Sequence, residues 1–405
     1  MKDKSTQKTA IIIGAGIAGC STAYALAKRG MAVTLIERHA EIAQGASGNP
    51  LAMLYPKFNT GMSVLSMMAS HGFTFTLDLL KQLPNIESIF QLCGQIQLAF
   101  NQREQEKQSA LLDSLHQHPT MQLLSSAETS AIANLALPSG GLYLPNAGWV
   151  KPQLLCQALI QSDLISRHVA SQALTIHQDG ENWQVTLADE QTLVADVVVL
   201  CNANDLHQFE PCAHLPITAV RGQVNFFKVN AVSKAMNMVI CTDHYLSPSV
   251  DGLHSIGTTY APNDQNPAVS AQDTYTNLQA LKQMSPAIFN SINQTEVTGR
   301  VAWRSATRDY LPLAGELIDA QILRKKPPRY NENPCDLPWL KGLYVNAGHG
   351  SKGMITAPLC GELIANLVMC EPLAIAQSLA TKLNPNRFLL RDMGLKQIAQ
   401  NLYDF

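Results

Sequence analysis

Three glycines near the start of the chain, Gly14, Gly16 and Gly19, restrict the possible folds more than any other feature. They follow a short apolar run, Ile11–Ile13, and precede an Ala/Leu-rich stretch that ends at Gly30. The apolar run is typical of a buried parallel strand, and the stretch after the glycines is typical of a helix. A second apolar run comes next and closes on an acidic residue. The order strand, turn, helix, strand predicts the βαβ unit of a nucleotide-binding domain.

Each part of this unit has a mechanical role. Gly14 permits the tight turn, Gly16 lets the backbone approach a pyrophosphate, and Gly19 lets the helix pack close to the strand. The helix N-terminus offers unpaired N–H groups to an anion. Glu37, eighteen residues after Gly19, stands where an acidic residue binds the ribose hydroxyls. The unit therefore predicts a dinucleotide site.

The same stretch superficially resembles a secretory signal, because Lys8 precedes an apolar segment that contains Ala25–Ala27. Three regularly placed glycines would weaken the helix of such a signal. The strand after Gly30 also continues the βαβ unit. We therefore prefer the dinucleotide interpretation.

Composition sets broad limits. The 405 residues predict two domains, and an apolar fraction of 46% is ample for a packed core without any run of transmembrane length. A net charge of −2 gives no whole-chain argument for nucleic acid, so an RNA substrate would need a local basic rim. Nine scattered cysteines without a Cys-x-x-Cys pair suit reduced thiols in a cytoplasm. We expect no bound metal, and His116 and His118 are expected to be solvated rather than ligands.

Two further segments point toward the same ligand. Gln44–Pro50 is either an ordinary surface loop or a loop along the cofactor with Ser47 or Asn49 as donors, and its place after the ribose-binding strand favours the second. Gly348–Gly353 follows another apolar strand and precedes a helix, but Met354 replaces the lysine of a phosphate-binding P-loop. We interpret it as a second glycine turn facing the same large cofactor.

These signals are spread along the chain, and elements of other types lie between them. A nicotinamide-dependent dehydrogenase would usually complete its nucleotide domain continuously, whereas here both ends return to it, which suits a flavin held lengthwise. The predicted class is α/β, with a Rossmann-like FAD-binding domain interleaved with an α+β substrate domain built on an antiparallel sheet. We assign residues 1–60, 150–210 and 340–405 to the FAD-binding domain and residues 61–149 and 211–339 to the substrate domain. Strands are expected at 169–176 and 239–246, and single helices at 153–165 and 271–290.

The chain resembles the glycine and D-amino-acid oxidase family of FAD enzymes, with a glycine oxidase-like fold. Within it, the chain is most similar to the oxidoreductase module of bifunctional enzymes that modify the wobble uridine of tRNA. The segments that carry the resemblance are Gly14–Gly19, Gln44–Asn49, Leu54–Pro56, Gly148–Pro152, Val220–Gln223, Arg304–Pro312 and Gly348–Gly353.

The resemblance implies a reaction on a carboxymethylaminomethyl group, which is an N-substituted glycine. The flavin would accept a hydride from the carbon between nitrogen and carboxylate, and the imine would hydrolyse to an aminomethyl base and glyoxylate. Dioxygen would reoxidise the flavin. Two alternatives remain: an amine or amino-acid oxidase acting on a free small molecule, and a flavin-containing RNA-binding scaffold without turnover.

The resemblance also implies site residues. Arg304 would grip the substrate carboxylate bidentately, although a structural salt bridge is the alternative. Arg308 and Arg300 lie close by and are weaker candidates, since either could face an RNA phosphate or solvent. Tyr245 would face the substrate or belong to the core, and Lys352 could place positive charge near the flavin.

The predicted FAD site is a larger set drawn from the glycine turns and the loops between them. Its members are Gly14, Gly16, Ile17, Ala18, Gly19, Glu37, Arg38, Ala46, Ser47, Asn49, Val169, Asn202, Gly348, Gly350, Ser351, Lys352, Gly353 and Met354.

Two departures from the bifunctional enzymes matter. Those enzymes carry an N-terminal methyltransferase half, for which residues 1–9 leave no room. We therefore expect either a stand-alone oxidoreductase or a fragment, with a separate methyltransferase acting on the product. Cys201–Asn204 also stands in place of the Ala-Thr-Gly-like loop at which the backbone of the family approaches FAD.

Overall fold

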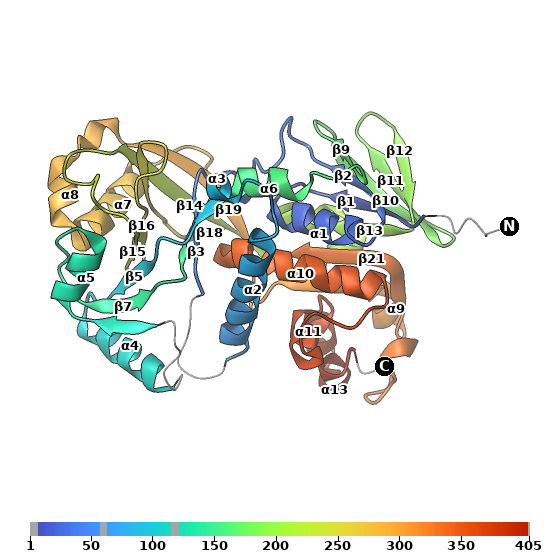
Figure 1. The fold of residues 1–405 in the computed structure, drawn as a ribbon. Helices are drawn as coiled ribbons and strands as arrows, with labels where there is room; N and C mark the ends of the chain where they lie inside the picture. Colours follow the sequence, from blue (N-terminus) through green and yellow to red (C-terminus); the bar gives the residue numbers. More distant parts are fainter. Residues whose placement is uncertain (1–6, 57–62, 115–120, 404–405) are drawn as a thin grey trace.

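A computed structural model describes residues 7–56, 63–114 and 121–403 (Figure 1). Its first layer is a six-stranded sheet in which five strands run parallel and the edge strand β20 runs antiparallel. The strands in spatial order are β20 (Leu313–Ile318), β21 (Trp339–Ala347), β13 (Val197–Leu200), β1 (Thr9–Ile13), β2 (Ala32–Ile36) and β9 (Ile165–His168).

The register of the central strands decides where the loops meet. Ile13 at the end of β1 is paired with Ile36 of β2 and with Leu200 of β13. The loops that follow these three strands therefore leave the sheet at one edge, which is where open parallel sheets bind their ligands.

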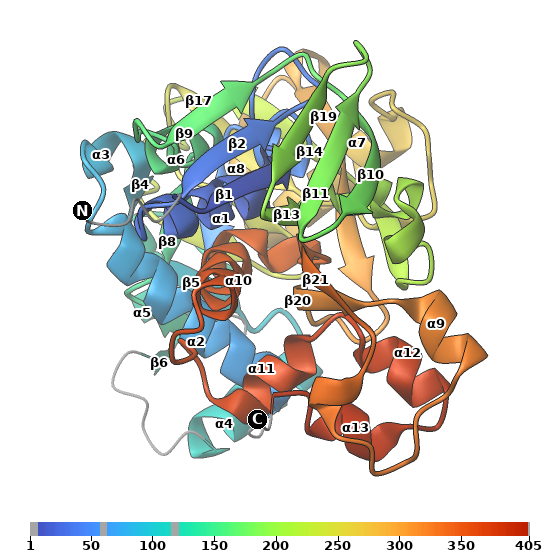
Figure 2. The ribbon, with the colours of Figure 1, turned by 90° about the vertical axis from the view of Figure 1, so that its right-hand side faces the viewer.

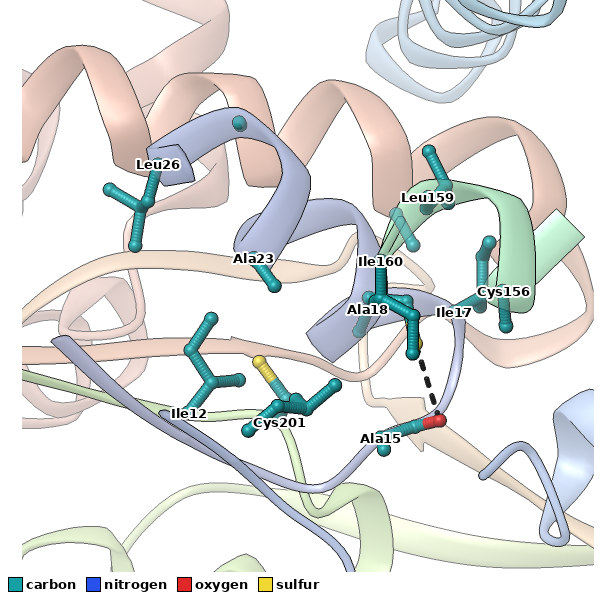
Figure 3. Close-up of a cluster of buried hydrophobic side chains, with 14 of the residues drawn as sticks. Ile12, Ala15, Ile17, Ala18, Ala23, Leu26, Cys156, Leu159, Ile160 and Cys201 are labelled. Carbon is teal, nitrogen blue, oxygen red and sulfur yellow. Dashed lines mark hydrogen bonds between the residues drawn. The ribbon is translucent and has the colours of Figure 1, made fainter. Parts of the chain in front are cut away.

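Helices cover one face of this sheet and a small sheet covers the other (Figure 2). Helices α1 (Ile17–Ala27), α6 (Pro152–Leu159) and α10 (Gly353–Val368) pack with Ile12 on the first face. Figure 3 shows Ala18 and Leu26 on α1 and Leu159 on α6, which belong to the same apolar cluster as Ile12. Because α1 is enclosed on nearly every side, its residues are apolar or small all round rather than amphipathic.

The opposite face is covered by β10 (Ala173–Asp179), β11 (Asn182–Leu187) and β12 (Thr192–Ala195), whose Trp183 and Val185 pack on Ile11 and Ile13. Alternate residues of one strand thus point into two different cores. The sequence prediction of β-branched residues in a strand buried on both faces is confirmed at β1.

The second layer is a nine-stranded, mainly antiparallel sheet at the left of Figure 1, and its core is packed against helices α7 (Ala271–Met284) and α8 (Pro286–Ser291). Its strands are β5 (Gln95–Leu98), β6 (Gln122–Leu124), β7 (Gly141–Leu144), β14 (Ile217–Lys228), β15 (Val239–Cys241), β16 (Tyr245–Leu246), β17 (Leu253–Gly257), β18 (Ala261–Pro262) and β19 (Thr298–Thr307). The mixed class with a parallel nucleotide-binding sheet and an antiparallel partner is confirmed.

The remaining elements connect or cap these layers. They are β3 (Ala52–Leu54), β4 (Phe90–Gln91), β8 (Gly148–Val150), α2 (Val64–Leu80), α3 (Ile86–Ile89), α4 (Gln102–Ser114), α5 (Ser126–Ala133), α7 (Ala271–Met284), α8 (Pro286–Ser291), α9 (Ala320–Lys325), α11 (Gln377–Leu383), α12 (Arg387–Asp392), α13 (Lys396–Gln400), and the 3₁₀ turns η1 (Ala46–Gly48), η2 (Ala203–Gln208), η3 (Glu210–Cys212), η4 (Gln294–Glu296), η5 (Pro334–Asp336) and η6 (Gly350–Lys352). Within the described ranges no helix is long and apolar enough to cross a membrane.

Several predicted elements have different bounds. The helix expected at 271–290 is two helices, because Pro286 has no N–H to donate and Ser285 instead caps α8 by accepting from the Ile288 N–H at 3.3 Å. The strand expected at 239–246 is a hairpin that turns at residues 242–244. The strand expected at 169–176 begins only at Ala173, and the helix expected at 153–165 ends at Leu159. His116 and His118 lie outside the described residues.

The pairing of β20 changes one boundary of the predicted domains. β20 lies within the 211–339 segment but pairs with β21 in the nucleotide-binding sheet. We propose the two discontinuous domains with residues 313–338 moved to the FAD-binding part, because a strand belongs with the sheet that satisfies its backbone hydrogen bonds.

Candidate active site

A cavity of about 920 Å³ lies between the carboxyl edge of the six-stranded sheet and the strands β14, β16, β17 and β19. This volume is at the upper end of the range for ligand pockets. Its walls come from the two glycine turns, from the segment 44–55, from the loop after β13 and from the segments 242–245, 257–260 and 300–305. Segments far apart in the sequence therefore face one enclosed space.

The first wall is the glycine turn between β1 and α1. Gly14 has a φ of +101°, and a Cβ at Gly19 would lie 1.8 Å from the Gly14 carbonyl oxygen. The Glu37 carboxylate is held here, since its two oxygens accept from the N–H groups of Ala15 at 2.9 Å and His39 at 3.0 Å. Each oxygen keeps a lone pair for a further donor, as a ribose hydroxyl would require.

The segment 44–49 is held in place by Arg300. From the sequence, this arginine is only a weaker candidate for the substrate site, since it could also face RNA phosphate or solvent. The Arg300 guanidinium donates to Asn49 Oδ1 at 2.6 Å and to the carbonyl oxygens of Gln44 at 2.8 Å and Gly45 at 2.7 Å. Ser47 faces α1, where its Oγ accepts from the Ile17 N–H at 3.0 Å. Arg300 thus shapes the cavity wall, a role that only a contact across about 250 residues could show.

The second glycine turn is organised by His349. Its Nε2 lies 3.0 Å from Asn346 Oδ1, and its Nδ1 lies 2.9 Å from Thr356 Oγ1. The Asn346 amide donates at the same time to Thr22 Oγ1 at 3.0 Å, which leaves its oxygen as the acceptor for a proton on Nε2. Through these hydrogen bonds a neutral His349 links β21, α10 and α1. Asn346 was not among the residues predicted from the sequence motifs.

Lowering the pH is expected to destabilise the protein through His349. Burial lowers the pKa of His349 to about 3, well below the usual value of about 6.5 in an unfolded chain. Below about pH 6.5 the imidazole is protonated in the unfolded chain but stays neutral in the folded protein. The contribution of His349 to the free energy of unfolding is therefore present above about pH 6.5 and is lost as the pH falls. We expect a loss of about 2 kcal/mol between pH 7 and pH 5. Urea unfolding of the wild type and of His349→Gln at both pH values measures it, and equal pH slopes would contradict the assignment.

The loop after β13 contributes polar atoms without partners. Both side-chain amide atoms of Asn202 and the Oδ1 of Asn204 are buried, and none has a hydrogen-bond partner among the described residues. Both residues line the cavity. Buried polar groups are nearly always paired, so these atoms indicate a polar ligand in this space. The replacement of the expected Ala-Thr-Gly-like loop thus still offers donors and acceptors to a cofactor.

Arg304 lies in the opposite wall, on β19. Its guanidinium donates to Thr258 Oγ1 at 2.8 Å and approaches the Thr259 carbonyl oxygen at 3.4 Å. It lies flat against Gly222 of β14, where a Cβ would be 2.5 Å from Nη1. Among the described residues no carboxylate lies within salt-bridge distance of Arg304, and its burial lowers its pKa. The alternative of a structural salt bridge therefore finds no partner in the described chain.

Two tyrosines belong to the same cavity as Arg304. Tyr245 and Tyr55 both line the cavity, and burial raises the pKa of each phenol. Both therefore keep their protons at neutral pH and can donate a hydrogen bond to a ligand. Neither is suited to abstract a proton from a substrate.

Most of the predicted site residues meet in this cavity, and three do not line it. Gly19 packs beneath the turn, and Val169 lies in the exposed connection after β9 with 41% of its surface accessible. Arg308 donates to Asp392 Oδ2 at 3.1 Å and stacks over Phe388. The predicted site residues that do line the cavity are Gly14, Gly16, Ile17, Ala18, Glu37, Arg38, Ala46, Ser47, Asn49, Asn202, Tyr245, Arg304, Gly348, Gly350, Ser351, Lys352, Gly353 and Met354.

Comparison with known proteins decides the family. The sequence profile described as FAD dependent oxidoreductase matches residues 9–367, which is most of the chain. The chain belongs to the FAD dependent oxidoreductase family. FAD is therefore the cofactor of this oxidoreductase, in agreement with the dinucleotide turn and the unpaired Asn202.

Curated relatives of this oxidoreductase share a longer architecture. The chain is 39% identical over 394 residues to the tRNA 5-methylaminomethyl-2-thiouridine biosynthesis bifunctional protein MnmC of Methylobacillus flagellatus, covering 97% of this chain and 61% of that protein. It is 38% identical over 396 residues to the protein of the same name from Pseudomonas putida, covering 95% and 60%. The chain thus spans about three fifths of the length of these relatives.

Solved structures confirm the glycine oxidase-like fold. Glycine oxidase from Geobacillus kaustophilus superposes with a TM-score of 0.77 at 22% identity, covering 94% of this chain and 99% of that one. Iminodiacetate oxidase from Chelativorans sp. BNC1 superposes with a TM-score of 0.76 at 19% identity, covering 93% and 98%.

Proposed function

We propose that this oxidoreductase removes the carboxymethyl group from 5-carboxymethylaminomethyl-(2-thio)uridine at the wobble position of tRNA. The products would be the 5-aminomethyl base and glyoxylate. The observation that carries the proposal is Arg304, a half-buried guanidinium without a carboxylate partner in the described chain, in the same cavity as the glycine turn after β1. The names of the relatives, which refer to biosynthesis of a modified tRNA uridine, select this N-substituted glycine among possible substrates.

The chain offers a consistent set of groups for FAD. The turn at Gly14–Gly19 and the N-terminus of α1 would take the pyrophosphate, and Glu37 would take the ribose hydroxyls. Asn202 and the backbone of the Gly348–Met354 turn would bond the remaining polar edges, and Lys352 would add positive charge. When bound, FAD supplies the hydride acceptor for oxidation of the carbon–nitrogen bond.

The protein's part in the reaction is chiefly orientation. Arg304 would hold the substrate carboxylate through two parallel N–H donors, which fixes the carbon between carboxylate and amine. Tyr245, which keeps its proton, would donate a hydrogen bond beside it. Loss of a hydride and a proton converts the substrate amine to an imine, and water then releases the aminomethyl base and glyoxylate.

The partners follow from this chemistry. A tRNA is the macromolecular substrate, which places the reaction in the cytoplasm, and dioxygen is the proposed oxidant that regenerates FAD. A methyltransferase, separate or on a further part of the same polypeptide, would consume the aminomethyl product.

Anaerobic reduction of the flavin tests the function. We expect tRNA that bears the modification to bleach the flavin absorbance stoichiometrically, with glyoxylate and the aminomethyl nucleoside detected by mass spectrometry. Unmodified tRNA, free glycine and sarcosine should leave the absorbance unchanged. Bleaching by the free amino acids alone would instead assign an amino-acid oxidase, a chemistry named in the solved neighbours. No bleaching by any of them would leave a flavin-containing scaffold.

A further inference from the structure

An exposed aromatic ring stands in the wall of the cavity at Tyr260. This residue lines the cavity, yet 56% of its surface is accessible, so it lies where the cavity meets solvent. Large apolar rings gain stability from burial, which makes an exposed ring at a cavity entrance a candidate ligand contact.

The backbone on both sides of Tyr260 is fixed, so its exposure is part of the fold. Before it, the Thr259 N–H donates to the Gln223 carbonyl oxygen at 3.3 Å, and Thr259 Oγ1 accepts from the Gln223 N–H at 3.0 Å. After it, β18 pairs with β14, and the Asn263 N–H donates to the Ala219 carbonyl oxygen at 2.9 Å. The ring is thereby presented from a hydrogen-bonded support on β14.

The loop that follows is also tied down, by a fully buried arginine. Arg221 donates to the carbonyl oxygens of Asn266 and Ala268, each at 2.7 Å, and pairs with Asp273. Trp303 Nε1 donates to the Asp264 carbonyl oxygen at 2.7 Å. Binding on Tyr260 would therefore require little ordering of the protein.

Tyr260 is also next to the proposed carboxylate site. Thr258 and Thr259, to which the Arg304 guanidinium donates hydrogen bonds, immediately precede Tyr260 in the chain. Both side chains line the same cavity, so a substrate whose carboxylate lies on Arg304 can extend toward the Tyr260 ring. In the proposed substrate the end opposite the carboxylate is a pyrimidine.

The charges of the cavity wall favour recognition of a base over recognition of phosphates. Arg38 is paired with Asp205 at 2.9 Å, and Arg300 is engaged by the segment 44–49. The rest of the lining holds Arg304 and Lys352, against the acidic Glu37 and Asp243. The residues that line the cavity therefore do not form the basic rim that an RNA substrate was expected to need. RNA bases that are splayed out of a loop are commonly bound by stacking on aromatic side chains.

We infer that Tyr260 is the platform on which the pyrimidine of the modified nucleotide stacks, and that it selects a base-linked substrate over a free amino acid. The inference rests on the proposed function and adds a specificity residue to it. The ring, rather than the phenol hydroxyl, supplies the contact.

The test uses the FAD-loaded full chain and an anticodon stem-loop RNA that carries the modified uridine. Tyr260→Ala should weaken RNA binding and raise KM by about 5- to 150-fold, the range expected for one lost base–aromatic stack. Its kcat should stay within about twofold, because Arg304 is untouched. Tyr260→Phe keeps the ring and should behave like the wild type. Tyr275→Ala is the matched control, since Tyr275 is 59% exposed on α7 but does not line the cavity.

Three results would overturn the inference while leaving the function intact: unchanged KM in Tyr260→Ala, a loss in Tyr260→Phe equal to that in Tyr260→Ala, or an equal loss in Tyr275→Ala. Failure of the proposed function looks different, because the wild-type flavin would then not be reduced by the modified RNA at all. RNA binding measured without turnover, by fluorescence anisotropy, separates loss of stacking from loss of chemistry.

Discussion

Replacing Arg304 with alanine is expected to leave FAD bound and to abolish most turnover of the N-substituted glycine. The guanidinium is half-buried beside Thr258 and Gly222 with no carboxylate among the described residues within salt-bridge distance, so its charge is available to the substrate. Losing a bidentate charged contact costs about 2–5 kcal/mol at the transition state, or roughly 30- to 5,000-fold in kcat/KM. Glyoxylate release measures turnover, and the flavin absorbance of the purified protein measures FAD.

Two variants separate the charge from its placement. A Cβ at Gly222 would lie 2.5 Å from Arg304 Nη1, so Gly222→Ala should displace the guanidinium without removing it and should also lower turnover. Arg308→Ala is the matched control, because Arg308 pairs with Asp392 and does not line the cavity. Unchanged kinetics in Arg304→Ala, or an equal loss in Arg308→Ala, would remove Arg304 from the site.

Replacing Gly19 with alanine is expected to produce protein that is unstable and largely free of FAD. The new Cβ would lie 1.8 Å from the Gly14 carbonyl oxygen, a backbone atom in the turn, so α1 must move away from β1. Overpacking of a tight core usually costs about 1–3 kcal/mol, and a clash with backbone lies at or above the top of that range. Moving α1 also displaces the N–H groups that would face the pyrophosphate.

Gly45→Ala provides the comparison for this variant. Gly45 lines the same cavity, but a Cβ there would have no atom within 4 Å, so alanine adds no clash and costs only the backbone strain of a ψ of −133°. We expect it to retain FAD and to lose less stability to urea than Gly19→Ala. Wild-type FAD content and stability in Gly19→Ala would show that the close packing at this turn is not needed.

The sequence signals that predict the nucleotide-binding half of the site are local, and the structure brings most of these residues to one cavity. A strand, three glycines, a helix and Glu37 occur within thirty residues, and each acts on its immediate neighbours. The break at Pro286 was also visible in the sequence, yet the helical periodicity on both sides hid it. The hairpin at 242–244 was missed for a related reason, since apolar residues on its two strands form one continuous run.

The other half of the site depends on long-range contacts. Arg300 was identified as a possible ligand, but the structure shows it clamping a segment about 250 residues away. No sequence motif marks Asn346, although its side chain joins His349 to α1. Arg308 belongs to the same sequence segment as Arg304, but its side chain is directed to Asp392. Sequence spacing along an irregular segment does not determine which way a side chain points.

By itself, the sequence determined which residue types the chain offers: a glycine turn suited to a dinucleotide, an acidic residue placed for a ribose, a second glycine turn and an arginine suited to a carboxylate. Only the tertiary structure decided that Arg304, Tyr245 and Tyr260 share one cavity with these turns, and which arginines are already engaged. The physical reason is range. Turns and helix starts follow from backbone conformation within a few residues, whereas the pairing of a buried charge is decided by whatever distant segment the fold packs against it.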